Sequence, residues 1–142
     1  ALKHAVTQKF PSLQIQTFQT GEACLERMKE MELKPDVVVL DYYLNSKNLD
    51  ALDGLGVLKR IKKISSKTKV IMLSAQDSLD IAMKCVDDGS YDYISKSESA
   101  FIKLNNTLNN IVDEIELNNT FFKPYQIVVI IFLIVLLIKF IL

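Results

Sequence analysis

The sequence is poor in glycine, proline and cysteine, and it has no excess of charge of either sign. It has 4 glycines and 3 prolines among 142 residues, while 49% of the residues are apolar. This composition excludes collagen-like, low-complexity and wholly disordered chains. Lysine and arginine (17) balance aspartate and glutamate (17), so the basic surplus typical of nucleic-acid-binding domains is missing. We therefore expect a single globular domain with no nucleic-acid partner.

The sequence also lacks a cysteine motif and a signal peptide. Its two cysteines, Cys24 and Cys85, lie 61 positions apart and outside any CxxC pattern. Both fall within amphipathic helical patterns, which predicts two small core residues of a reduced cytosolic domain. A disulfide between them is the alternative. No apolar run of the signal-peptide kind precedes the first predicted elements.

Hydrophobicity is concentrated at the C-terminus instead. From Tyr125 to Leu142, 16 of 18 residues are apolar. Such a stretch forms a helix about 27 Å long, close to the roughly 30 Å of a bilayer's hydrocarbon core. The pattern predicts a transmembrane helix over 125–142, joined by a linker at 119–124 to a domain at 1–118. A buried apolar helix or a buried pair of strands is the alternative.

Residues 1–118 alternate short apolar runs with amphipathic stretches. The runs predict strands at Leu13–Phe18, Asp36–Leu40, Lys69–Ser74 and Tyr91–Ile94. The amphipathic stretches predict helices at Gly21–Met31, Gly54–Ile64 and Ser78–Val86, and a long helix from Ser97. This alternation indicates an α/β fold with a doubly wound parallel sheet, covered by helices on both faces.

Three polar residues follow consecutive strands of this predicted sheet. In doubly wound sheets the chemistry gathers at the carboxyl ends of the strands, where Asp41, Ser74 and Lys96 stand. A carboxylate can attack phosphorus and form an acyl phosphate. A hydroxyl and an ammonium group can bind the phosphoryl oxygens. Taken singly, Asp41 could be only a cap, and Lys96 only a solvated surface residue.

The order of these residues resembles the receiver domain of two-component response regulators. The matching stretches are PDVVVLDYYL, DGLGVLKRIKK, KVIMLSAQDS and DDGSYDYISKS, and the similarity covers about residues 1–117. The resemblance implies the flavodoxin-like, three-layer α/β/α fold with strand order 2-1-3-4-5. It also implies roles for six residues: Asp41 as phosphoacceptor, Ser74, Ala75 and Lys96 around the phosphate, Ser74 and Tyr93 as the switch pair, and Asp41 with the Tyr43 backbone carbonyl as ligands of Mg²⁺.

The resemblance further implies a function. A sensor histidine kinase or a phosphotransfer protein would phosphorylate Asp41, adding about −1.5 to −2 charge. Ser74 and Tyr93 would then move and reshape the surface built by the helix near 78–86, the strand near 91–94 and the helix from 98, where a downstream partner would bind. The chain would not be an enzyme. We expect a cytoplasmic domain anchored to the inner membrane through 125–142.

Two other functions stay open. The first is a phosphate-independent, membrane-tethered interaction module. The second is a phosphatase with an aspartyl nucleophile, although such enzymes use an Asp-x-Asp pair and position 43 is Tyr.

The sequence departs from the receiver pattern at its start. It has neither the first apolar strand of the family nor the pair of acidic residues that follows this strand and holds the metal. Ala1–Phe10 corresponds to the end of the family's first helix. We therefore expect an N-terminally clipped domain with an open slot between the second and third strands of the family. In addition, 13 positions separate Asp41 from Gly54, more than in the family, and Ser97 replaces the proline usual after the lysine.

Overall fold

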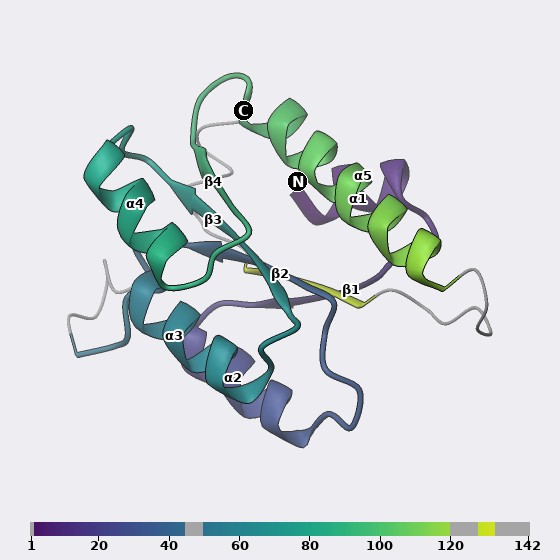
Figure 1. Cartoon of the computed structure of the whole chain (residues 1–142), viewed down its shortest axis with the longest axis horizontal. Coiled ribbons are helices and arrows are strands. Elements are labelled where there is room, and N and C mark those ends of the chain that lie inside the picture. The colour runs from purple at the N-terminus through teal and green to yellow at the C-terminus, as the bar shows by residue number, and fades with distance from the viewer. Residues whose placement is uncertain (1, 45–49, 120–127, 133–142) are drawn as a thin grey trace.

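The computed structural model describes residues 2–44, 50–119 and 128–132, which form five helices and five strands (Figure 1). The helices are α1 (Leu2–Lys9), α2 (Gly21–Glu30), α3 (Gly54–Ile64), α4 (Leu79–Asp87) and α5 (Ala100–Asn118). The strands are β1 (Gln14–Phe18), β2 (Val37–Asp41), β3 (Lys69–Ser74), β4 (Asp92–Ser95) and β5 (Val128–Phe132).

The five strands form one parallel sheet in the order β1-β5-β2-β3-β4. Its two faces are covered by different helices (Figure 1). On one face, α1 and α5 pack against buried side chains of the sheet such as Val39 and Ile71. On the other, α2, α3 and α4 pack against Val38 and Met72. The predicted doubly wound, three-layer fold is therefore confirmed.

The helices begin where short polar side chains can accept hydrogen bonds from free backbone N–H groups. Thr20 accepts from the N–H of Ala23 and caps α2, and Ser78 accepts from Ile81 and caps α4. Gly89 ends the α4 region with a φ of +95°. Residues that carry a side chain rarely adopt this backbone conformation, whereas glycine adopts it readily. The last helix begins at Ala100, three residues later than predicted, and Ser99 precedes it without a capping side-chain bond.

The main surprise is the strand from the apolar C-terminal region. β5 pairs in parallel with β1 over five residues, from Gln14–Val128 to Phe18–Phe132, and with β2 over three. The open slot predicted at this place in the sheet is therefore wrong, because β5 lies there between β1 and β2. The structure therefore has the family's strand order, with its central strand supplied from the C-terminal end of the chain.

The transmembrane helix predicted over 125–142 is thus wrong for residues 128–132, while 120–127 and 133–142 lie outside the described residues. A continuous apolar run fits a helix and a buried parallel strand equally well, and the run is rich in valine and isoleucine. Residues 128–132 form a strand because β1 and β2 would otherwise have unpaired backbone N–H and C=O groups in the centre of the sheet. Within the described parts of the chain, no helix has the length and apolar character needed to cross a membrane.

The two cysteines confirm the prediction of reduced core residues. Cys24 on α2 and Cys85 on α4 are both free and fully buried in the same apolar cluster. Burial raises the pKa of Cys24 to about 12 and that of Cys85 to about 11. The alternative of a disulfide is therefore wrong for this structure.

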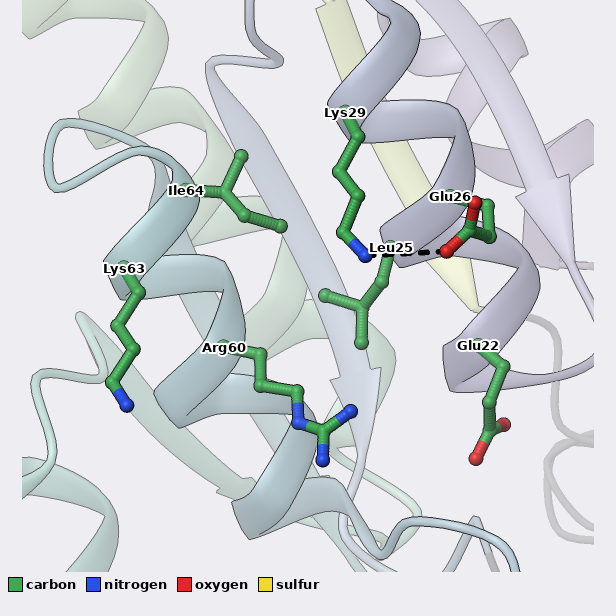
Figure 2. A pocket seen from close by; sticks show the side chains of 7 residues that line it. All are labelled: Glu22, Leu25, Glu26, Lys29, Arg60, Lys63 and Ile64. Carbon is green, nitrogen blue, oxygen red and sulfur yellow. Dashed lines mark hydrogen bonds and ion pairs between the residues drawn. The ribbon is translucent and has the colours of Figure 1, made fainter.

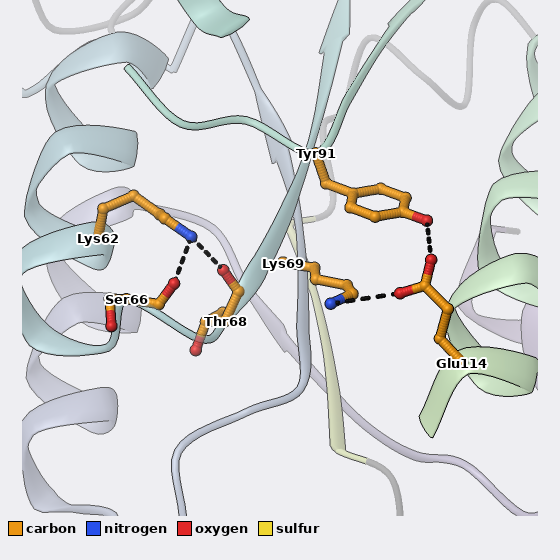
Figure 3. Close-up of polar contacts among 6 residues, drawn as sticks. All are labelled: Lys62, Ser66, Thr68, Lys69, Tyr91 and Glu114. Carbon is orange, nitrogen blue, oxygen red and sulfur yellow. Dashed lines mark hydrogen bonds and ion pairs between the residues drawn. The ribbon is translucent and has the colours of Figure 1, made fainter. Parts of the chain in front are cut away.

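Polar contacts at the amino ends of the strands attach α5 to the sheet (Figure 3). Glu114 on α5 lies 3.5 Å from the ammonium group of Lys69 and accepts a 2.9 Å hydrogen bond from the Tyr91 hydroxyl. On the other face, the ammonium group of Lys62 donates to the carbonyls of Ser66 and Thr68. These contacts stabilise the edge opposite to the one at which Asp41 lies.

Candidate functional site

The three predicted site residues meet at the carboxyl edge of the sheet. Asp41 ends β2, Ser74 ends β3, and Lys96 directly follows β4. The strand register places these three residues at the same height along the sheet, since Asp41 pairs with Leu73 and Ser74 pairs with Ser95. The backbone N–H of Lys96 also donates to the Ser74 carbonyl at 2.7 Å. Three segments far apart in the sequence thus converge on one point.

Asp41 and Lys96 form a buried ion pair. The Lys96 ammonium lies 3.1 Å from Asp41 Oδ1, and the two side chains are 2% and 1% exposed. Lys96 is therefore not a solvated surface residue, and Asp41 does more than end a strand. Burying either charge alone would cost several kcal/mol, so each depends on the other.

The two carboxylate oxygens of Asp41 differ in their surroundings. Oδ1 receives both the Lys96 ammonium and a 3.2 Å hydrogen bond from the N–H of Tyr43. Oδ2 is buried and has no hydrogen-bond partner among the described residues. Buried polar atoms without partners are uncommon in proteins, and each needs an explanation. Oδ2 is thus the oxygen of the Asp41 carboxylate that no described residue engages.

Ser74 and Tyr93 lie together around Gln76. The buried Ser74 hydroxyl accepts a 3.2 Å hydrogen bond from the N–H of Gln76, and the Tyr93 hydroxyl donates to the Gln76 carbonyl at 2.7 Å. Burial raises the pKa of Tyr93, and its contact with the Ser74 hydroxyl partly opposes this shift. Ala75, between Ser74 and Gln76, is exposed and adds no bulk beside the hydroxyl. The predicted switch pair therefore shares one hydrogen-bonded segment.

Gly54, which the sequence predicted as the start of a helix, also packs directly against the backbone of the site. Its N–H donates to the Tyr42 carbonyl at 2.8 Å, and an added Cβ would lie 2.2 Å from the carbonyl oxygen of Asp41. Only glycine allows α3 to start against the backbone that carries Asp41. A glycine at the start of an amphipathic helix, directly after a capping aspartate, was the available signal. Asp53 is that cap, because it accepts from the N–H of Gly56.

The long loop after Asp41 is described at both ends, and residues 45–49 lie outside the described part. At its start, the rings of Tyr42 and Tyr43 meet edge to face with centroids 5.0 Å apart. At its end, the N–H of Leu52 donates to the carboxylate of Glu22 at 2.8 Å. The loop is therefore attached to α2 next to the site.

The described residues make only part of a magnesium site. Receiver domains generally bind Mg²⁺, which prefers six oxygen ligands in near-octahedral geometry. Here Asp41 Oδ2 is free, and the Tyr43 carbonyl is a second oxygen nearby in sequence. Within the described residues, however, no three His, Cys, Asp or Glu residues gather to hold a metal. β5, in the place of the family's acidic strand, reads VVIIF and has no side-chain oxygen. The predicted ligand set of Asp41 and Tyr43 is thus incomplete for Mg²⁺.

Comparison with known proteins agrees with this geometry. The family model of the response regulator receiver domain matches residues 1–108. The chain is 32% identical to the transcriptional regulator NtrC of Escherichia coli K12 over 80 residues, which cover 56% of the chain and 16% of NtrC. It is 29% identical to the chemotaxis protein CheY of Bacillus subtilis over 94 residues, which cover 64% of the chain and 72% of CheY.

A solved structure shares the fold as well. The receiver domain of the Francisella response regulator 1452 superposes with a TM-score of 0.63 at 25% identity, covering 79% of this chain and 88% of that domain. The chain spans only a small part of the length of NtrC. The matched region includes Asp41, Ser74, Tyr93 and Lys96. The chain therefore belongs to the response regulator receiver domain family of two-component signalling.

Proposed function

We propose that Asp41 accepts a phosphoryl group from a sensor histidine kinase or a phosphotransfer protein, and that the change is passed to a protein partner. One observation carries the proposal. Asp41 has one oxygen held by Lys96 at 3.1 Å and a second, buried oxygen with no partner among the described residues. This arrangement fixes the carboxylate while leaving one oxygen free to react.

The chemistry follows from these positions. Asp41 Oδ2 attacks the phosphorus of a phosphohistidine and forms an acyl phosphate. The phosphorus–nitrogen bond breaks, and its electron pair goes to the imidazole, which takes up a proton. Lys96 and the Ser74 hydroxyl are placed to bind the oxygens of the transferred group, because both lie at the same strand edge. In this reaction the chain is an acceptor and not an enzyme.

The signal leaves through the segment that joins Ser74 to α4. If Ser74 turns toward the phosphoryl oxygens, its hydroxyl loses the hydrogen bond from the Gln76 N–H. Gln76 can then shift, which breaks the hydrogen bond from the Tyr93 hydroxyl to the Gln76 carbonyl. α4 begins three residues after Gln76 and exposes a stripe of three large apolar residues: Leu79 (75%), Met83 (55%) and Val86 (60%). Their i, i+4, i+7 spacing gives one helix face suited to a partner.

Intact mass measurement after incubation with phosphoramidate tests the phosphoryl transfer. The chain should gain one phosphoryl group, and Asp41→Asn should gain none. The exposed variant Met83→Gln is a matched control, because it changes the proposed docking stripe and should be phosphorylated as the parent chain is. Absence of the mass gain in the parent chain, both with and without added Mg²⁺, would refute the proposal.

A phosphate-independent interaction module is the second candidate. It is favoured by the incomplete magnesium ligand set, since one carboxylate binds a divalent cation weakly. In that case the Asp41–Lys96 pair is permanent and the α4 stripe is always available. Partner binding would then be lost in Met83→Glu but unchanged in Asp41→Asn. A loss of binding in Asp41→Asn, with its fold intact by circular dichroism, would eliminate this candidate.

A further inference from the structure

A groove lies between α2 and α3, and none of the residues that line it belongs to the phosphoacceptor site. It has a volume of about 260 Å³. Its floor is apolar: Leu25 is 4% exposed, Ile64 is half-buried, and the two side chains point toward each other across the groove (Figure 2). The volume is just below the roughly 300–1,000 Å³ of drug-sized ligand sites. The groove therefore has the size for a small molecule with an apolar chain.

The charged side chains at the rim of the groove differ in whether they already have a partner. The two acidic residues of α2 that line the groove are already engaged: Glu22 accepts the Leu52 N–H at 2.8 Å, and Glu26 lies 3.2 Å from the Lys29 ammonium. Arg60 of α3 is exposed and makes no ion pair or hydrogen bond within the described residues, and Figure 2 shows it reaching toward α2. The free charge beside the apolar floor is thus positive.

We propose that this groove binds a small carboxylate with a straight apolar chain of medium length. Its chain would lie over Leu25 and Ile64, and its carboxylate would receive hydrogen bonds from the Arg60 guanidinium, whose planar fork matches a carboxylate. A ligand there would lie against Glu22, which holds the loop that borders Asp41. The site is separate from Asp41, so the proposal stands independently of phosphorylation.

Sodium octanoate is the probe, and ¹⁵N–¹H correlation spectra of the full chain are the readout. Octanoate should shift amide signals of α2 and α3 with a Kd on the order of 1 mM, as expected for a ligand of about ten non-hydrogen atoms. Octylammonium and acetate serve as comparisons, since the first reverses the charge and the second lacks the chain. Both should bind at least about 10-fold more weakly.

Two variants separate the site from general surface binding. Arg60→Gln should weaken octanoate binding about 10-fold, because it removes the charge-assisted hydrogen bonds. Lys103→Gln, an exposed residue of α5 on the opposite face, and Asp41→Asn should leave the Kd unchanged. The proposal is overturned if octanoate causes no saturable shifts in α2 and α3 at 10-fold above about 1 mM. Equal binding of octylammonium, or of the Arg60→Gln variant, would overturn it too.

Discussion

Breaking the backbone pairing of β5 should destabilise the whole domain, because this strand lies between β1 and β2. Ile130 pairs with Gln16 on one side and with Val38 on the other. Proline at this position has no N–H, so Ile130→Pro removes one ladder hydrogen bond and places a pyrrolidine ring inside a central strand. No position of an inner strand offers proline a harmless place.

The size of the effect can be worked out from one hydrogen bond. Leaving a buried carbonyl of a neighbouring strand without its donor costs about 1–3 kcal/mol. A central value of about 2 kcal/mol is a large share of the roughly 5–15 kcal/mol that stabilises a domain. With a urea m-value of about 1–3 kcal/mol/M, the unfolding midpoint should fall by about 1 M. If the strand leaves the sheet altogether, β1 loses its one partner in the described sheet, and the loss grows further.

Urea unfolding followed by far-UV circular dichroism measures this change. Ile130→Val is the matched control, because it keeps the β-branched backbone preference and removes one methylene. The difference between the two variants therefore isolates the backbone contribution. If Ile130→Pro unfolds at the same urea concentration as Ile130→Val, β5 does not belong to the folded sheet and the topology described above is refuted.

Three further predictions concern buried groups. Lys96→Met should destabilise the fold by about 3–5 kcal/mol, because Asp41 stays charged and buried without its partner, and Asp41→Asn/Lys96→Met should restore most of the loss in urea unfolding. Gly54→Ala should cost about 1–3 kcal/mol, since its Cβ would meet the Asp41 carbonyl oxygen at 2.2 Å; an unchanged thermal midpoint would contradict that contact. Burial raises the pKa of Cys24 to about 12 and that of Cys85 to about 11, from an ordinary 9.0. The contribution of the two neutral thiols to the free energy of unfolding is therefore complete below pH 9 and is lost as the pH rises through 11 to 12. Iodoacetamide at pH 8 should therefore label neither cysteine in the folded chain and both in urea, as counted by intact mass.

The sequence predicted well whatever depends on local chemistry. α3 (Gly54–Ile64) and β3 (Lys69–Ser74) begin and end where the pattern placed them, because capping residues and β-branched runs act within a few positions of themselves. The convergence of Asp41, Ser74 and Lys96 was also predictable. It follows from the rule that parallel strands bring their carboxyl ends to one edge.

The apolar C-terminal region could not be assigned in the same way. Between Ile127 and Ile138 every residue is apolar, so neither the period of a helix nor that of a strand is visible. What decides the structure of Val128–Phe132 is the unpaired backbone of β1 and β2. β1 lies over a hundred residues away in sequence, and β2 about ninety. Likewise, the close approach that requires Gly54 is set by the Asp41 backbone on another element. Both depend on partners that local patterns do not contain.

The Asp41–Lys96 pair is better explained by function than by stability. Replacing a buried ion pair with apolar residues of similar volume is often neutral or stabilising by about 1–4 kcal/mol. An apolar pair would also fit its surroundings, since β2 is otherwise all valine and leucine. The chain instead keeps a carboxylate with one buried oxygen unpartnered among the described residues, which carries a further cost. A fold selected for stability alone would lose both groups, so their presence at the edge where β2, β3 and β4 end points to a reaction of that carboxylate.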